Sequence, residues 1–186
     1  WSRGLGDVYK RQDMADYQWA VPVDLLLSVA RRESEFDQYA KSSAGALGLM
    51  QVMPGTAQEM AKNLKIPFEE ESLTTSWKYN VLLGATYLQE LSYRYRGNPI
   101  LIAASYNAGP SNADKWIQHL GSPLDRKTNL IDWVEMIPFR ETRNYVMRIT
   151  ESLTLYKTLV VGKEIDHEFS EFLGSSAYFS FTPQSE

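Results

Sequence analysis

Cysteine is absent from this 186-residue sequence, and histidine and long apolar runs are scarce. Without cysteine the chain can form neither a disulfide nor a thiolate zinc site. The two histidines, His119 and His167, are isolated in the sequence, whereas a zinc site needs several ligands at a usable spacing. We therefore expect no metal and no cofactor. No apolar run approaches the about 18 residues of a membrane-spanning helix, so we also expect no transmembrane segment in this chain.

The charge balance argues against nucleic acid as the main partner. Lys and Arg total 19 and Asp and Glu total 23, which gives a formal net charge of -4 at pH 7. Nucleic-acid-binding domains are usually basic. The acidic run at residues 69–71 is typical of a solvated face rather than a metal site. The length and the 44% hydrophobic content are ordinary for one globular domain with its own core.

Helical periodicity recurs along the chain. Val23, Leu26, Leu27 and Ala30 follow a three/four spacing, and Pro22 suits a first turn, so this pattern predicts a helix over residues 22–35. Gly and Pro punctuation separates further expected helices over residues 54–63, 77–96, 100–109, 112–119 and 141–161. The 77–96 helix is expected to carry Leu82, Ala85, Leu88 and Leu91 on one stripe. With no alternating strand pattern, the sequence predicts an all-α domain.

The two ends of the chain fit this pattern poorly. Residues 1–12 have neither the apolar core nor the cleavage site of a signal peptide, and we interpret them as a cloning or assembly scar. On that interpretation the natural N-terminus, with any signal peptide or preceding domain, is missing. The domain is then expected over residues 13–161, and residues 162–186 are expected to form a loosely packed tail.

Glu33 is the candidate general acid. It shares an apolar helical stripe with Leu26 and Ala30, and it falls in the last turn, where the helix dipole disfavours negative charge. Both effects predict a raised carboxyl pKa, which a general acid working near neutrality needs. On this pattern alone, an ordinary helix-end glutamate paired with Arg31 or Arg32 is the better interpretation.

Three sequence blocks, in order, change that interpretation. The first, RRESEFDQYAKSSAGALGLMQVMPGTAQ, contains Glu33-Ser34, Ser42 and Gly48-Leu49-Met50-Gln51, and its Gly45 and Gly48 mark tight turns or close backbone contacts. The second is ASYNAGP and the third is IPFRETRNYV. Together they resemble the soluble lytic transglycosylases, and the resemblance covers about residues 22–156. It implies a lysozyme-like helical fold of the goose type, the SLT domain.

The resemblance also implies a reaction. In this family a single carboxyl group, matching Glu33, protonates the oxygen between N-acetylmuramic acid and N-acetylglucosamine in peptidoglycan. The 2-acetamido group of the substrate stabilises the cation. The same glutamate then takes a proton from the 6-hydroxyl, which closes a 1,6-anhydro ring without consuming water. A periplasmic location is expected, because peptidoglycan lies outside the cytoplasm, and glycan strands are the expected partner.

Four residues of the first block are expected to bind the glycan by resemblance. Gly48, Met50 and Gln51 would line the groove, and Ser42 would orient the acetamido group. Two alternatives stay open: Met50 as a core residue under the loop, and Ser42 as the cap of a turn. Leu47 stands where a small residue is common in the family, which could change the groove.

Three residues of the later blocks complete the expected site. Tyr106 would hydrogen-bond close to the catalytic glutamate, or serve only the core. Asn107 would contact substrate, or cap the end of its helix. Glu141 would bind substrate as the second acidic position, or be favoured at a helix start by the dipole alone. Ser105 stands where Ala is more usual.

Two other functions remain open. A hydrolytic lysozyme-type muramidase would need a second carboxylate roughly 5 to 9.5 Å from the first. Asp37 and Glu141 are available, but no motif places either for that role. A non-catalytic glycan-binding module would be marked by loss of the catalytic glutamate, and Glu33 is present. All three functions share a fold, so the reaction products must separate them.

Overall fold

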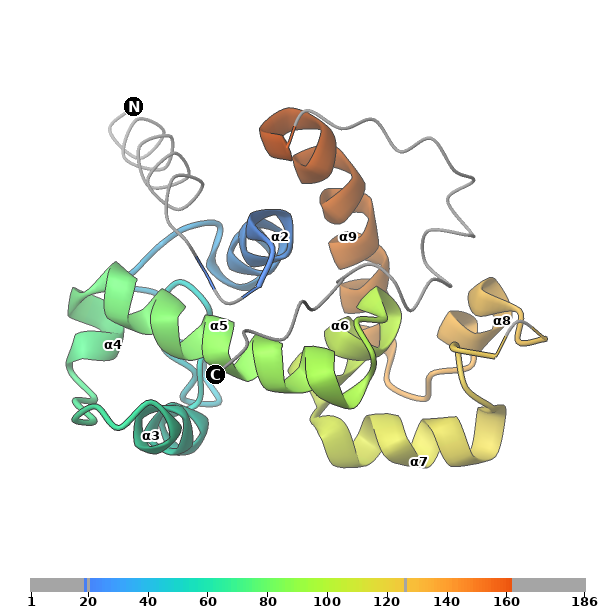
Figure 1. The fold of residues 1–186 in the computed structure, drawn as a ribbon, viewed down its shortest axis with the longest axis horizontal. Coiled ribbons are helices and arrows are strands. Elements are labelled where there is room, and N and C mark those ends of the chain that lie inside the picture. Colours follow the sequence, from blue (N-terminus) through green and yellow to red (C-terminus); the bar gives the residue numbers. More distant parts are fainter. Residues whose placement is uncertain (1–18, 20, 126, 162–186) are drawn as a thin grey trace, which may run out of the picture. The chain divides into compact units, whose positions relative to one another are not determined.

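The computed structural model describes residues 19, 21–125 and 127–161 (Figure 1). The predictions made for residues 1–12, for the tail at 162–186 and for His167 lie outside the described residues. Within them the structure is helical and contains no named strand, although isolated antiparallel bridges join Lys41 to Leu47 and Leu47 to Val52. The all-α prediction is confirmed.

The predicted helices are all present, with ends shifted by a few residues at most. The described elements are α2 (Val23–Ser34), α3 (Pro54–Asn63), α4 (Ser72–Thr75), α5 (Trp77–Arg94), α6 (Pro99–Ala108), α7 (Pro110–Leu120), α8 (Leu130–Glu135), α9 (Arg140–Tyr156) and the π-helical turn η1 (Lys157–Val161). The sequence does not predict α4 and α8. With 4 and 6 residues, they are too short to display a 3.6-residue period.

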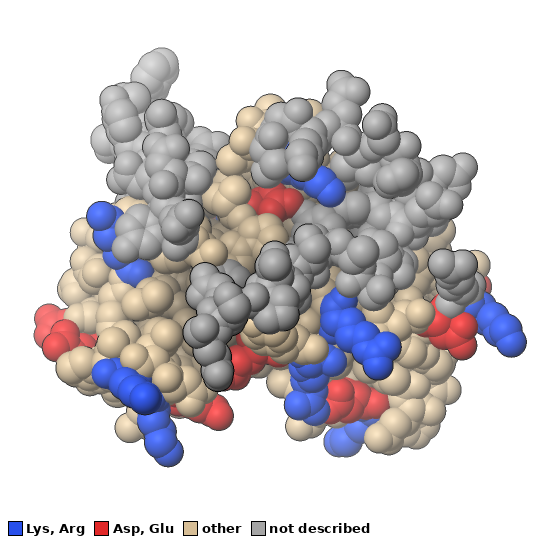
Figure 2. Space-filling model, in the orientation of Figure 1, with Lys and Arg blue, Asp and Glu red and all other residues tan. Residues whose placement is uncertain are grey.

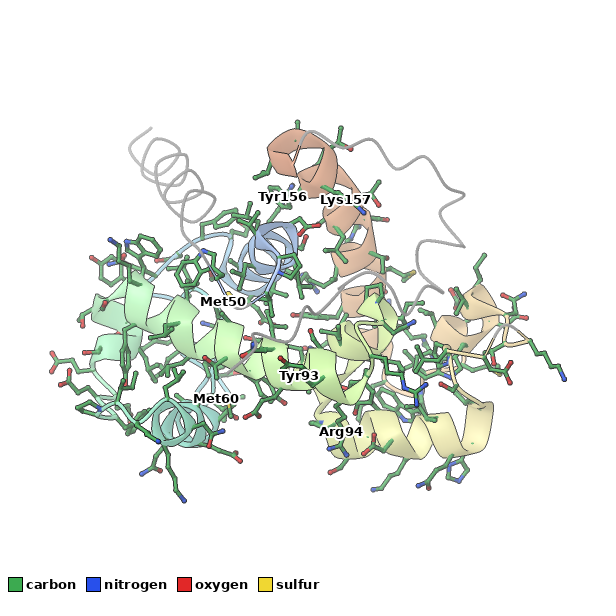
Figure 3. All side chains as sticks on the ribbon, viewed as in Figure 1. Met50, Met60, Tyr93, Arg94, Tyr156 and Lys157 are labelled. Carbon is green, nitrogen blue, oxygen red and sulfur yellow. The ribbon has the colours of Figure 1, made fainter. Side chains whose placement is uncertain are left out.

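The described residues form two compact units, each with its own core. Unit 1 holds the described residues up to Gln89 together with 155–161. Its core residues are fully buried and come from α2, the following loop, α3, α4 and α5: Leu25, Leu26, Leu49, Met50, Met60, Leu73, Leu83 and Leu88. Figure 3 labels Met50 and Met60 among them. The turn η1 contacts α2 within this unit.

The predicted stripe on α5 is wrong at one position. Leu82 is 37% exposed, whereas its neighbour Leu83 is fully buried. A repeated step of three residues advances about 300° around an α-helix, so positions 82, 85, 88 and 91 drift around the circumference instead of sharing one face. The other three predicted positions are buried.

Unit 2 holds the described residues of 90–154. Asn98 begins α6, because its side chain accepts a hydrogen bond from the Leu101 N–H at 3.0 Å and Pro99 occupies the first turn. Trp133 is fully buried, and its indole N–H donates to the Gly121 carbonyl at 2.9 Å. Only Gly109 separates α6 from α7 in the sequence, and the two helices contact each other.

Candidate functional site

Glu33 lies half-buried in the last turn of α2. The helix ends directly after it, because Glu35 adopts a left-handed conformation with φ 52° and its N–H donates to the Arg31 carbonyl at 3.0 Å. Phe36 continues this turn with φ 66° and is only 4% exposed. Two successive left-handed residues other than glycine carry backbone strain of about 1 to 2 kcal/mol each. Such strain tends to cluster at functional sites, and the burial of Phe36 offsets it here.

Ser34 connects the end of α2 to the glycine-rich loop, which we define as residues 40–52. Its hydroxyl donates to the Leu49 carbonyl at 2.8 Å and lies 3.2 Å from the Ala30 carbonyl. The residue next to the candidate acid therefore fixes the backbone of the loop. The predicted Glu-Ser pair thus has a structural link to the Gly-Leu-Met-Gln segment.

The glycine-rich loop is held by a dense set of backbone hydrogen bonds. Leu47 and Val52 exchange two of them, at 3.1 and 3.0 Å, and Gly48 N–H donates to Ala40 O at 2.9 Å. Gln51 is half-buried with φ 47°, and its side-chain amide donates to Gly48 O at 2.9 Å and Ala40 O at 3.1 Å. The side chain of Gln51 therefore stabilises the loop.

Ser42 and Gly45 shape the exposed tip of this loop. The Ser42 hydroxyl accepts a hydrogen bond from the Ala46 N–H at 2.9 Å, and the Ser42 N–H donates to the Ala46 carbonyl at 3.0 Å. Gly45 has φ 90° and open space where a Cβ would lie. The turn-capping role proposed for Ser42 is therefore present, and its contact with an acetamido group remains a prediction.

Gly48 needs both its conformation and its lack of a side chain. Its φ is 75°, and a Cβ there would lie 2.1 Å from the Leu73 carbonyl oxygen and 2.3 Å from Asn80 Nδ2. Met50, which the resemblance placed in the groove, has a fully buried side chain. Its backbone N–H donates to Asn80 Oδ1 at 2.8 Å. The core packing that we considered for Met50 is what this structure displays.

Asn80 is a site residue that the sequence did not indicate. It lies within α5, a polar residue among apolar ones, and its side chain is fully buried. Its amide donates to the carbonyls of Leu47 at 2.8 Å and Leu73 at 3.1 Å. A single asparagine inside a helix gives no periodic signal, so only the structure reveals its partners.

Unit 2 carries the other three predicted residues. Tyr106 and Asn107 are half-buried in the last turn of α6, and Glu141 is exposed in the first turn of α9. The Thr142 hydroxyl donates to Asn107 Oδ1 at 2.7 Å, and Thr142 is 2% exposed. Asn107 therefore links α6 to α9. The structure thus groups Tyr106, Asn107 and Glu141 in one unit, and Glu33, Ser42, Gly48, Met50 and Gln51 in the other.

In the part of the chain that the structure describes, no group of three or more His, Asp or Glu residues is arranged to hold a metal ion. Over that same part, no helix combines the length and the apolar character needed to cross a membrane.

The family described as Transglycosylase SLT domain matches residues 11–129. The chain belongs to this family. The match includes Glu33, the glycine-rich loop and the ASYNAGP block, and it ends before the IPFRETRNYV block. The prediction made from the sequence blocks is thereby confirmed at the level of the family.

Longer proteins resemble this SLT chain over most of its length. A protein of Haemophilus influenzae is 39% identical over 145 residues, which make up 78% of this chain and 24% of that protein. The soluble lytic murein transglycosylase of Escherichia coli is 34% identical over 144 residues, or 77% of this chain and 21% of that protein. The chain therefore spans about a quarter or less of the length of these relatives.

Solved structures of SLT proteins share the fold. An inactive glutamate-to-glutamine mutant of the lytic transglycosylase Slt from Pseudomonas aeruginosa has a TM-score of 0.70 and 30% identity, covering 86% of this chain and 24% of that one. The 70-kDa soluble lytic transglycosylase from Escherichia coli has a TM-score of 0.68 and 33% identity, covering 75% and 22%. The lysozyme-like SLT fold is thus confirmed.

Proposed function

We propose that this chain is a lytic transglycosylase that cleaves the β-1,4 bond between N-acetylmuramic acid and N-acetylglucosamine in peptidoglycan. The observation that carries the proposal is the position of Glu33, a half-buried carboxyl in the last turn of α2 of an SLT domain. Ser34 beside it is bonded to the glycine-rich loop at 2.8 Å. The inactive glutamate-to-glutamine mutant of the Pseudomonas aeruginosa relative supports a requirement for one glutamate in such enzymes.

One carboxyl group can perform both proton transfers of this reaction. Glu33 first donates its proton to the glycosidic oxygen, the bond from that oxygen to C1 breaks, and the 2-acetamido oxygen bonds to C1. Glu33, now a carboxylate, takes the proton of the 6-hydroxyl. O6 then bonds to C1 and displaces the acetamido oxygen, which leaves a 1,6-anhydro ring. Because O6 belongs to the same sugar, the second attack is intramolecular and favoured by proximity.

The glycan-binding roles are part of the proposal. Ser42 is exposed at the loop tip, Tyr106 and Asn107 are half-buried and Glu141 is exposed, so glycan hydroxyl and acetamido groups can reach their polar atoms. In the glycine-rich loop, Gly48 and Gln51 would contribute mainly through a fixed backbone. Met50 would act from the core, by supporting that backbone. We propose no metal and no cofactor, because this acid–base chemistry needs neither.

The proposed location of the chain follows from its proposed substrate. Peptidoglycan lies outside the cytoplasm, so the chain would act in the periplasm on glycan strands. The catalytic domain is proposed to comprise residues 13–161. The greater length of the relatives supports a further domain in the parent protein.

The products of digestion test the proposed function. We would digest purified peptidoglycan with the native chain and with Glu33→Gln, then weigh the released muropeptides by mass spectrometry. The native chain should release 1,6-anhydro ends, and Glu33→Gln should be slower by about 100-fold or more, the usual contribution of a general acid. Glu35→Gln is the matched control, because Glu35 is exposed and outside the apolar stripe, and it should retain native activity.

Each other product would replace the proposal with a named alternative. Products heavier by one water, with reducing ends, would indicate a lysozyme-type muramidase and a second carboxylate. No release by folded native chain, with retained binding to peptidoglycan, would indicate a glycan-binding module.

A further inference from the structure

Helix α5 presents Asn80 and Gly84 one turn apart, on the same side of the helix. Both meet the same residue of the glycine-rich loop. Asn80 Oδ1 accepts a hydrogen bond from the Met50 N–H at 2.8 Å. A Cβ added at Gly84 would lie 2.8 Å from both Cβ and Cγ of Met50 and 3.2 Å from its Cε. One side of α5 is therefore fitted to the backbone and to the side chain of Met50, whose position on the ribbon is labelled in Figure 3.

The side-chain amide of Asn80 forms hydrogen bonds to the glycine-rich loop and to Leu73 in α4. Its two amide hydrogens go to the carbonyls of Leu47 and Leu73, at 2.8 and 3.1 Å, while its oxygen takes the Met50 N–H. Burying a side-chain amide costs free energy unless its N–H and C=O groups have hydrogen-bond partners. An amide with all its partners favours a single geometry. Gly48 leaves the space that this amide occupies, since a Cβ there would lie 2.3 Å from Asn80 Nδ2.

The same loop segment is also joined to the helix that carries the candidate acid. Ser34, the neighbour of Glu33, donates to the Leu49 carbonyl at 2.8 Å. Leu49 lies between Leu47 and Met50, the two residues bonded to Asn80. The segment is therefore fixed from α5 on one side and from the end of α2 on the other.

We propose that Asn80 and Gly84 are positioning residues for glycan cleavage, acting through Met50 to hold the glycine-rich loop in register with Glu33. This inference rests on the proposed function. Neither residue needs to touch the substrate. Their contribution is to keep the loop backbone within the small tolerance that a reacting geometry allows.

The first test compares activity per folded molecule, measured as release of 1,6-anhydro products by the full chain at temperatures well below melting. Asn80→Ala removes the acceptor of the Met50 N–H and the donors to the carbonyls of Leu47 in the loop and Leu73 in α4. It should lower kcat/KM by about 100-fold, the effect of a misplacement near 1 Å. Met60→Ala is the control. Met60 is 1% exposed on α3 of the same unit, so this variant should melt lower but keep kcat/KM within about threefold of native.

The second test asks whether Gly84 acts through Met50. Gly84→Ala favours the helix itself but places a methyl group against Met50, so it should lower kcat/KM by about tenfold or more in the native background. Met50→Ala removes Cγ and Cε, two of the three atoms that this methyl group would meet, and keeps Cβ. In the Met50→Ala background, Gly84→Ala should therefore lower kcat/KM by clearly less than in the native background, a coupling that a double-mutant cycle measures.

The outcomes separate this inference from the proposed function. The inference is overturned if the native chain is active and Asn80→Ala loses no more activity per folded molecule than Met60→Ala. It is equally overturned if Gly84→Ala has the same effect with and without Met50. A folded native chain that releases no anhydro products overturns the proposed function, and the inference with it. Faster amide exchange at Met50 in Asn80→Ala, together with the activity loss, supports the positioning role.

Discussion

Three glycines of unit 1 differ in what an added methyl group would meet. Gly48 has φ 75° and a blocked Cβ position, Gly45 has φ 90° with open space, and Gly55 lies in α3 with open space. Gly48→Ala should destabilise the fold by about 3 kcal/mol or more, because its methyl group would overlap a backbone carbonyl. Gly45→Ala should cost about 1 to 2 kcal/mol, the price of the left-handed conformation alone.

Gly55→Ala is the control within this series. It replaces a helical glycine without a clash, so it should leave stability unchanged or raise it by up to about 1 kcal/mol. Urea unfolding of the three variants measures the order directly. Equal losses of unfolding free energy in Gly48→Ala and Gly45→Ala would mean that the loop can move away from Leu73 and Asn80. That result would contradict tight packing at Gly48.

At the scale of single residues, the sequence predicts positions that carry a local signal. Glu33 is predictable because it combines a helical stripe, a helix end and a family block, and Gly48 because glycine marks special backbone geometry. Asn80 is not predictable in this way, because its three hydrogen-bond partners belong to residues 47, 50 and 73. Only the fold brings those residues to it. The burial of Met50 was likewise undecided by the sequence, since its segment has no regular period.

At the scale of elements, a charged cluster joins α5 to α7 in unit 2. Arg94 (labelled in Figure 3) forms an ion pair with Asp114, and the Tyr95 hydroxyl donates to the same carboxylate at 3.0 Å and lies 3.3 Å from the Pro110 carbonyl. The hydrogen bond from Arg94 is the largest cause of the lowered pKa of Asp114; burial opposes it, and the hydrogen bond from Tyr95 adds a smaller lowering. Burial in turn raises the pKa of Tyr95.

The lowered pKa of Asp114 predicts a pH-dependent contribution to stability. A carboxyl whose folded pKa lies below its unfolded value, about 3.9, stabilises the fold above that value and loses the contribution as pH falls through the folded pKa. Asp114→Asn should therefore be less stable than native at pH 7 and equal to it near pH 2. Because the side chains are 53% and 35% exposed, solvent screening limits the difference at pH 7 to about 1 kcal/mol or less.

Chemical denaturation at pH 7, 4 and 2 measures this difference. Glu151→Gln is the matched control, because it breaks the Arg148–Glu151 pair of 3.0 Å on one helix, with side chains 68% and 61% exposed. That pair should contribute almost nothing at any pH. A difference between Asp114→Asn and native that persisted at pH 2 would assign the effect to packing and not to charge.

The sequence pattern predicts short helices less well than long ones whose ends are marked by Pro and Gly. Helix α6 was predictable because Pro99 and Gly109 delimit an apolar run, and the structure has Gly109 at φ 85°. Helix α8 was not, although Asn129 caps it by accepting hydrogen bonds from Ile131 and Asp132. A cap indicates a helix start only when a periodic segment follows, and 6 residues are too few to supply one.

At the scale of the whole molecule, the net charge affects whether the chain is attracted to its proposed substrate over a distance. The formal net charge is -4 at pH 7. On the face shown in Figure 2, basic and acidic residues are interspersed among the described residues that are visible. An acidic protein is not attracted over a distance to an anionic cell wall. Under the proposed function, recognition of glycan would then depend on short-range contacts in the site.

The proposed glycan cleavage should respond only weakly to ionic strength. Raising NaCl from 20 to 200 mM shortens the Debye length from about 20 Å to about 7 Å and screens repulsion between the acidic chain and anionic strands. The rate at low peptidoglycan concentration should therefore stay constant or rise, by less than about tenfold, the lower limit of electrostatic steering. Release of anhydro products at both salt concentrations measures it, with peptidoglycan whose carboxyl groups have been amidated as the less charged control substrate, whose cleavage should change less. A steep fall with salt, confined to unmodified peptidoglycan, would reveal attraction by a basic surface and contradict recognition through local contacts alone.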